Sequence, residues 1–303
     1  TPRVVNVANT KLTVSGSLGG VRSLSAGDGG QVTLMSAGNT LGSVSGYYDF
    51  DAVLVKGSGS VVVGAASVLN AVNVTTNNAA TLTLNSGGNL TCGLLYVDKS
   101  STVFVNGVVS IRAQNATFVS GSVVDGAGRG YGSGSGPGAG ASAAQGAAHA
   151  ACGSQAAACN TAVTAANRVY GDVLQPSLPG SGGAAGSGAG GSGGAAVRLV
   201  AGTLLLNATV TVDAANGAGS SSSYASGGGS GGSIWVSANT LLPSYGVLRS
   251  NGGNGATGYT SGYHSNGGSG GRIALTCVSE VAQAASSLTY RAWGANGPSA
   301  TTT

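Results

Sequence analysis

The chain has 303 residues, of which 57 are glycine, 42% are hydrophobic and only 7% are charged. The hydrophobic content excludes simple disorder, which requires low hydrophobicity and high net charge. No stretch approaches the roughly 18 consecutive apolar residues of a membrane-spanning helix. The net charge of +4 comes from scattered single charges, so no basic stripe indicates nucleic-acid binding.

Residues 1–125 form a succession of short runs with the signature of β-strands. Each run is rich in β-branched residues, alternates roughly with period two and ends at Gly, Asn or Ser. The runs are KLTVSGS from Lys11, GQVTLMS from Gly30, AVLVKG from Ala52, SVVVGA from Ser60, ATLTLNS from Ala80 and TVFVNG from Thr102. Their close spacing leaves no room for amphipathic helices, which excludes a doubly wound α/β fold. A β-sandwich and a β-solenoid remain.

Residues 126–194 are a Gly/Ala-rich insertion that contains two of the four cysteines. Three disulfide connectivities are open, and we favour Cys152–Cys159 because that pair closes the shortest loop; Cys92 and Cys277 would form the second pair. Seven residues of straight helix rise about 10.5 Å, whereas a disulfide needs Cα atoms about 4.4–6.8 Å apart. The bonded segment therefore cannot be a straight helix. Four buried thiols are the alternative.

Residues 195–303 carry a repeat that decides between the two β architectures. GGSGG occurs at residues 190–194, 228–232 and 267–271, and each copy leads into a short apolar run. In these runs Val197, Ile234 and Ile273 correspond, as do Leu199, Val236 and Leu275. A second apolar run and an Asn-Gly element then complete each unit of about 38 residues. Such a period predicts stacked coils.

The predicted fold is therefore all-β, a parallel β-helix (β-solenoid) with long Gly-rich loops at one corner. Corresponding strands would lie about 4.8 Å apart in one continuous solenoid, and residues such as Val197 and Ile234 would form an internal aliphatic stack. We further hypothesise that the glycine loops pack on one another as polyproline-II-like layers. The alternative is that they are flexible linkers.

The second half of the chain resembles a known group of proteins. The matching pieces are His149, the R-V-Y-G motif at residues 168–171, Pro176, the glycine-rich residues 180–183, and the units at residues 228–234, 250–255 and 267–273. These pieces resemble the glycine-rich, pectin-lyase-like β-helical repeats of large extracellular and cell-surface proteins of protists, algae and bacteria, including mastigoneme-like components of filaments and flagellar hairs. The chain departs from that pattern where alanines flank His149. The resemblance implies a structural or adhesive role and no catalytic residues.

Few residues suit catalysis. Asp49 and Asp51 are the best carboxylate pair, since residues i and i+2 of a strand share a face, but a polar corner of an early coil explains them better. His149 and His264 lie in Gly-rich surroundings without a recognisable triad. The glycines lack the contexts that bind nucleotides or calcium. We therefore expect no enzyme, no cofactor and no metal site.

Two kinds of surface site are expected. Asn73, Asn89, Asn115 and Asn207 begin N-x-[ST] sequons, which are glycosylation acceptors if the protein is secreted. Trp235 is opposite in phase to Ile234 and Val236 and should point outward, where it is a candidate for subunit contacts. Tyr259 and Tyr263, in a glycine loop, are further interface candidates because exposed aromatic rings stack on sugars or neighbouring subunits.

The sequence thus favours a structural subunit or module of an extracellular or cell-surface glycoprotein assembly, and the resemblance above implies a filamentous one. Its partners would be copies of itself or other subunits of the filament, with glycans as further ligands, and neither nucleic acid nor a membrane span is expected. An adhesive or carbohydrate-binding surface module is the main rival. A polysaccharide lyase or hydrolase is the third candidate.

Overall fold

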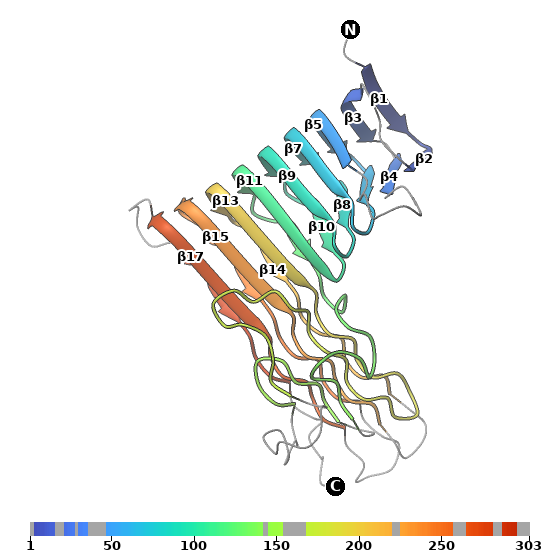
Figure 1. The fold of residues 1–303 in the computed structure, drawn as a ribbon, viewed down its shortest axis with the longest axis vertical. Helices are drawn as coiled ribbons and strands as arrows, with labels where there is room; N and C mark the ends of the chain where they lie inside the picture. The colour runs from blue at the N-terminus through green and yellow to red at the C-terminus, as the bar shows by residue number, and fades with distance from the viewer. Residues whose placement is uncertain are drawn as a thin grey trace.

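The chain was analysed as a computed structural model, which describes residues 3–15, 21–27, 30–35, 47–141, 145–153, 168–219, 225–256, 265–280 and 287–295. All eighteen regular elements of this part are β-strands, and no helix occurs in it (Figure 1). The described residues accordingly include no helix long and apolar enough to cross a membrane. The predicted all-β class is confirmed.

The strands form two parallel sheets of nine. The first sheet contains β1 (Arg3–Ala8), β3 (Val21–Gly27), β5 (Tyr47–Lys56), β7 (Val68–Asn77), β9 (Asn89–Val97), β11 (Val108–Phe118), β13 (Ala196–Leu206), β15 (Ser233–Leu241) and β17 (Arg272–Glu280). The second contains β2 (Lys11–Ser15), β4 (Gln31–Met35), β6 (Ser60–Val63), β8 (Thr81–Leu84), β10 (Thr102–Val105), β12 (Val123–Asp125), β14 (Thr209–Thr211), β16 (Val247–Arg249) and β18 (Thr289–Arg291). Strands of the two sheets alternate along the chain, an order consistent with a solenoid-like fold (Figure 1).

The N-terminal half has a repeat of 21 residues that the sequence analysis did not detect. Val53 pairs with Val74, and Val74 with Leu95, each step advancing 21 residues. The second sheet has the same step, from Val61 to Leu82. All five side chains are buried in one continuous hydrophobic core that receives residues from both sheets.

The long strands of the first sheet bend in the middle. In β7 the inward residues Ala71 and Val74 are separated by two exposed residues, Val72 and Asn73. A straight strand would alternate strictly, so two consecutive outward residues mark a corner. Val72 is also left out of the register with both neighbouring strands. The same corner recurs in β11, β13 and β15, and it gives each coil a third inward row of side chains.

The 38-residue repeat of the second half is confirmed in register. Val197 pairs with Ile234 and Ile234 with Ile273, as predicted. Val197 and Ile234 are almost completely buried, so the expected aliphatic stack exists. The Asn-Gly elements also acquire a role: the side chain of Asp213 accepts a hydrogen bond from the backbone N–H of Asn251, one repeat later. Each such bond ties two adjacent coils.

The described glycine-rich segments lie side by side at one end of the strands (Figure 1). Residues 227–232 form the centre of this bundle, and their backbone N–H groups donate to three neighbours in rotation. Gly227 and Ser230 donate to segment 181–184, Gly228 and Gly231 to segment 266–269, and Gly229 and Gly232 to segment 212–215. A rotation of three is the period of a polyproline-II helix.

The carbonyl oxygens of the same residues point to three other neighbours. Those of Gly227 and Ser230 accept from segment 191–194, those of Gly228 and Gly231 from segment 147–149, and those of Gly229 and Gly232 from segment 250–253. Residues 227–232 are therefore surrounded by six segments and buried throughout. This arrangement agrees with the polyproline-II-like packing hypothesis and contradicts the flexible-linker alternative for the described loops.

Glycine is required in the bundle because the backbones approach too closely for a side chain. A Cβ built on Gly229 would overlap the carbonyl oxygen of Ser192, and one built on Gly232 would overlap that of Ala195. Gly132, by contrast, has open space where its Cβ would lie. The loss of backbone entropy that makes glycine costly elsewhere is offset here by the hydrogen bonds that close approach allows.

We predict that Gly229→Ala destabilises the protein by roughly 3 kcal/mol or more, because overpacking a filled interior forces the backbone apart. Chemical unfolding followed by circular dichroism measures this difference. Gly132→Ala is the matched control and should change the free energy of unfolding by less than about 0.5 kcal/mol. Equal effects of the two substitutions would contradict the close-packed bundle.

Candidate functional site

A row of polar and aromatic side chains crosses the outer face of the first sheet. Asn89 in β9 pairs with Ser110 in β11, Ser110 with Arg198 in β13, and Arg198 with Trp235 in β15. These positions are opposite in phase to buried residues such as Val197 and so point outward. The predicted outward direction of Trp235 is thus confirmed, although the side chain is half-buried rather than fully exposed.

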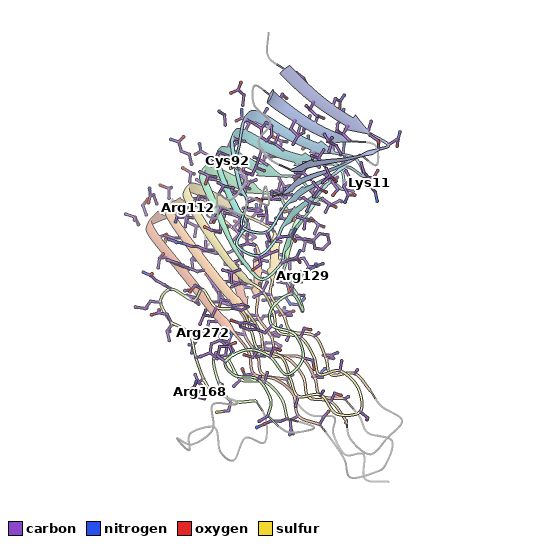
Figure 2. The ribbon with its side chains drawn as sticks, turned by 45° about the vertical axis from the view of Figure 1, so that its right-hand side comes forward. Lys11, Cys92, Arg112, Arg129, Arg168 and Arg272 are labelled. Atoms are coloured by element: carbon purple, nitrogen blue, oxygen red, sulfur yellow. The ribbon has the colours of Figure 1, made fainter. Side chains whose placement is uncertain are left out.

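A hollow of 370 Å³ lies over this row. Asn89, Ser110, Arg198 and Trp235 line it from the sheet, and Gln175 and Ser177 from the segment that crosses above. That segment is held down by two hydrogen bonds. The hydroxyl of Ser233 donates to the carbonyl oxygen of Leu178, and the Nε of Arg272 donates to that of Tyr170. Arg272 is labelled in Figure 2.

Positive charge concentrates beside the hollow. The guanidinium carbon of Arg198 lies 4.0 Å from the centre of the Trp235 ring, a cation–π contact. Burial lowers the pKa of Arg198, and the charge of Arg112 lowers it further; Arg112 extends from the neighbouring strand β11 (Figure 2). Within the described part of the chain neither arginine has an ion-pair partner. The Nε of Arg198 and the hydroxyl of Ser110 are covered and have no hydrogen-bond partner there.

Sequence reasoning identified Trp235 but missed Arg198, Ser110 and Gln175. Arg198 could have been found from the sequence. Aligning Val197 with Ile234 in the repeat places Arg198 directly beside Trp235. Ser110 could not be found in the same way, since the insertion separates β11 from β13 in the sequence. The interface candidates Tyr259 and Tyr263 lie outside the described residues.

His149 occupies a buried structural position in the glycine bundle. Its ring stacks on that of Tyr170, with centroids 4.5 Å apart. Its Nδ1 donates to the carbonyl oxygen of Gly231 at 2.7 Å, since a carbonyl oxygen can only accept; this fixes the tautomer. The imidazole N–H thus donates to the carbonyl oxygen of Gly231 in the same way as the backbone N–H of Ala147 donates to that of Gly228. The motif residues that carried the resemblance, His149, Tyr170 and Gly171, thus meet in one cluster.

The acidic candidates gain no support as a catalytic pair. Asp49 and Asp51 both lie in β5. Asp51 is exposed at the corner of its coil, which agrees with the interpretation of the two residues as a polar corner. The side chain of Asp49 and the whole of His264 lie outside the described residues. The described residues contain no group of three His, Cys, Asp or Glu side chains that could hold a metal ion.

The proposed second disulfide, Cys92–Cys277, is wrong, because both residues are thiols. Through Ala113, Ala201 and Ala238 they occupy the same register column of the first sheet, but four strands apart. Four strand spacings amount to about 19 Å, far beyond disulfide reach. Burial raises the pKa of Cys92 to about 12 and makes its thiol unreactive. The Cys152–Cys159 pairing stays a prediction, because Cys159 lies outside the described residues.

The sequon asparagines lie on the outer surface. Asn73, Asn89 and Asn115 are exposed, and Asn207 is half-buried. Asn73 and Asn115 both follow the corner of their coils, two coils apart in the same register column, so that glycans there would project from the outer face along one corner. The side-chain oxygen of Asn207 accepts a hydrogen bond from the N–H of Tyr245 and ties two coils.

No known protein family, curated protein or solved structure matches the chain. The resemblance to glycine-rich surface repeats therefore stays a prediction, and the function has to be argued from the geometry.

We predict that the protein loses stability as the pH falls from about 6.5 to 4. Burial lowers the pKa of His149 from 6.5 to about 4, the nearby positive charge of Arg272 adding to this, so the unfolded state binds a proton in a range where the folded state does not. The free energy of unfolding therefore falls as the pH drops below the unfolded pKa of His149. At pH 4 the decrease that comes from this histidine reaches about 3 kcal/mol.

Unfolding in denaturant at several pH values measures this slope. In His149→Asn the side chain no longer titrates, so the part of the slope between pH 6.5 and 4 that comes from His149 should vanish even if the variant is less stable at every pH. An unchanged slope in that variant would contradict the buried, neutral histidine.

Proposed function

We propose that this chain is a structural module of an extracellular or cell-surface assembly, in which its coils form a closed β-solenoid that stacks end to end without catalysis. The observation that supports this proposal is the pair of open sheet edges. The two nine-stranded parallel sheets end at β1 and β2 on one side and at β17 and β18 on the other. Unpaired backbone groups on an edge strand are a template for pairing with another chain.

The inward-facing apolar side chains of the last described coil are partly exposed to solvent. Ile273 and Leu275 of β17 are only partly buried, whereas Ile234 and Val236, their partners in β15, are completely buried. All three residues of β18 are exposed. One more coil stacked on β17 and β18 would remove this apolar surface from water, which is worth about 25 cal/mol per Å².

A second copy would supply such a coil, as would further coils of a longer chain. The β1 and β2 of a second copy present the opposite edges of the same two sheets, so head-to-tail stacking keeps every strand parallel. A head-to-tail interface that does not close into a ring generates a filament. The exposed aromatic ring of Trp293, next to β18, adds contact area at this end.

The chemistry of the described surface supports a passive, extracellular role. Three of the four sequon asparagines are exposed on strands or strand ends, where they are accessible for glycan attachment. With only 7% of its residues charged, the protein gains solubility from attached glycans. A surface module that binds carbohydrate remains the second candidate.

We predict that the purified chain forms filaments or concentration-dependent oligomers, visible by negative-stain microscopy and analytical ultracentrifugation. Leu275→Glu places a charge inside the open end and should leave the protein monomeric, because an inward-pointing charge blocks strand addition. Val278→Glu, on the same strand but 85% exposed, is the matched control and should still assemble. A wild-type chain that is monomeric at every concentration, or assembly of Leu275→Glu at the wild-type level, would contradict the proposal.

A further inference from the structure

The hollow beside Trp235 lies over strands whose backbone is fully engaged. β9, β11, β13 and β15 are interior strands, each paired with a neighbour on both sides. An extended peptide cannot add to such a surface, because strand addition needs an unpaired edge. Recognition in the hollow therefore depends mainly on side chains and not on strand addition.

Those side chains match an anionic sugar. The hollow combines an aromatic ring, a guanidinium fork, amides and hydroxyls, and no acidic residue lines it. Aromatic rings pack against sugar rings, and side-chain amides and hydroxyls form hydrogen bonds with sugar hydroxyls. Arginine binds planar anions through two parallel hydrogen bonds. Its volume of 370 Å³ is at the lower end of the roughly 300–1,000 Å³ of small-ligand sites.

The polar groups of the hollow are incomplete without a ligand. The Nε of Arg198 and the hydroxyl of Ser110, paired across adjacent strands, lack partners in the described structure. Leaving buried donors unpaired is unfavourable. Arg112, whose charge acts on Arg198, adds a second positive charge that no described carboxylate neutralises. Both atoms are covered in the described structure, so a ligand in the hollow reaches them only when the Arg198 side chain shifts. An anionic oxygen beside Arg198 and Ser110 would then satisfy both groups and offset the repulsion between the arginines.

We propose that this hollow binds a sugar residue carrying a carboxylate or sulfate group, with the anion on Arg198 and Ser110 and the sugar ring against Trp235. Gln175, Ser177 and Asn89 would bond the sugar hydroxyls. The site does not depend on end-to-end stacking, since it lies on the side of the coils. Because Asn89 lines the hollow, a glycan attached to Asn89 would exclude the ligand.

Binding can be measured through the fluorescence of Trp235 in the full chain carrying Trp293→Phe, which leaves one tryptophan. Thr91→Ala removes the sequon and retains Asn89. The probes are a disaccharide containing glucuronic acid, a sulfated disaccharide without carboxylate, a neutral disaccharide and penta-glutamate. We expect saturable binding of one or both anionic disaccharides, weakened by salt; comparing the two identifies the anion.

Arg198→Gln should weaken this binding about 10- to 100-fold, the effect of losing hydrogen bonds to a charged group. Arg198→Lys should recover only part of it, because lysine keeps the charge and loses the fork. Arg291→Gln is the matched control, since Arg291 lies over Trp293, away from the hollow, and it should bind normally. This control is measured by calorimetry in the chain that retains Trp293, and unchanged thermal unfolding confirms that each variant folds.

Four outcomes would overturn the proposal: no binding of either anionic disaccharide, equal binding of the neutral disaccharide, equal binding of penta-glutamate, or an Arg198→Gln variant that folds and binds like the wild type. If Arg198→Gln fails to fold, fluorescence changes of Trp235 in the unsubstituted site still decide between binding and no binding. Filament formation without sugar binding would overturn this inference and leave the structural proposal standing.

Discussion

The structure depends on the close approach of glycine backbones around residues 227–232. Each residue there donates to one neighbouring segment and accepts from another, and the directions repeat every three residues. A single Cβ at Gly229 or Gly232 would separate two of these segments. Because the six neighbours come from several parts of the chain, this one constraint determines the paths of the described glycine-rich segments and explains a glycine content of nearly a fifth.

The bundle and the sheets stabilise each other. Segments 191–194, 228–232 and 267–271 run directly into β13, β15 and β17, so the register of the strands sets the register of the loops. Asp213, Asn251 and Asn207 reinforce the same register with side-chain bonds to the next coil. A coil constrained in this way at both ends presents a fixed outer face. That rigidity suits a structural module, and it also keeps Arg198 and Trp235 in place.

Much of this fold was predictable because its repeats are visible in the sequence. The equivalence of Val197, Ile234 and Ile273 follows from the GGSGG spacing alone, and it proved to be the register of the sheet. The 21-residue repeat was missed because its strands carry no fixed motif, only the inward position of residues such as Val53 and Val74. The pairing of β11 with β13 across the insertion, and with it the hollow, required three-dimensional structure. The error on Cys92 and Cys277 arose because counting cysteines ignores how far apart the coils lie.

Amide hydrogen exchange tests the glycine bundle most directly. If residues 227–232 are held by six neighbours, their amides should exchange as slowly as those of the adjacent strand β15 (Ser233–Leu241), because both can open only by unfolding of the same body. Exchange at the rate of an unstructured glycine-rich peptide, with β15 still protected, would show that the loops are not an ordered bundle and would contradict the account.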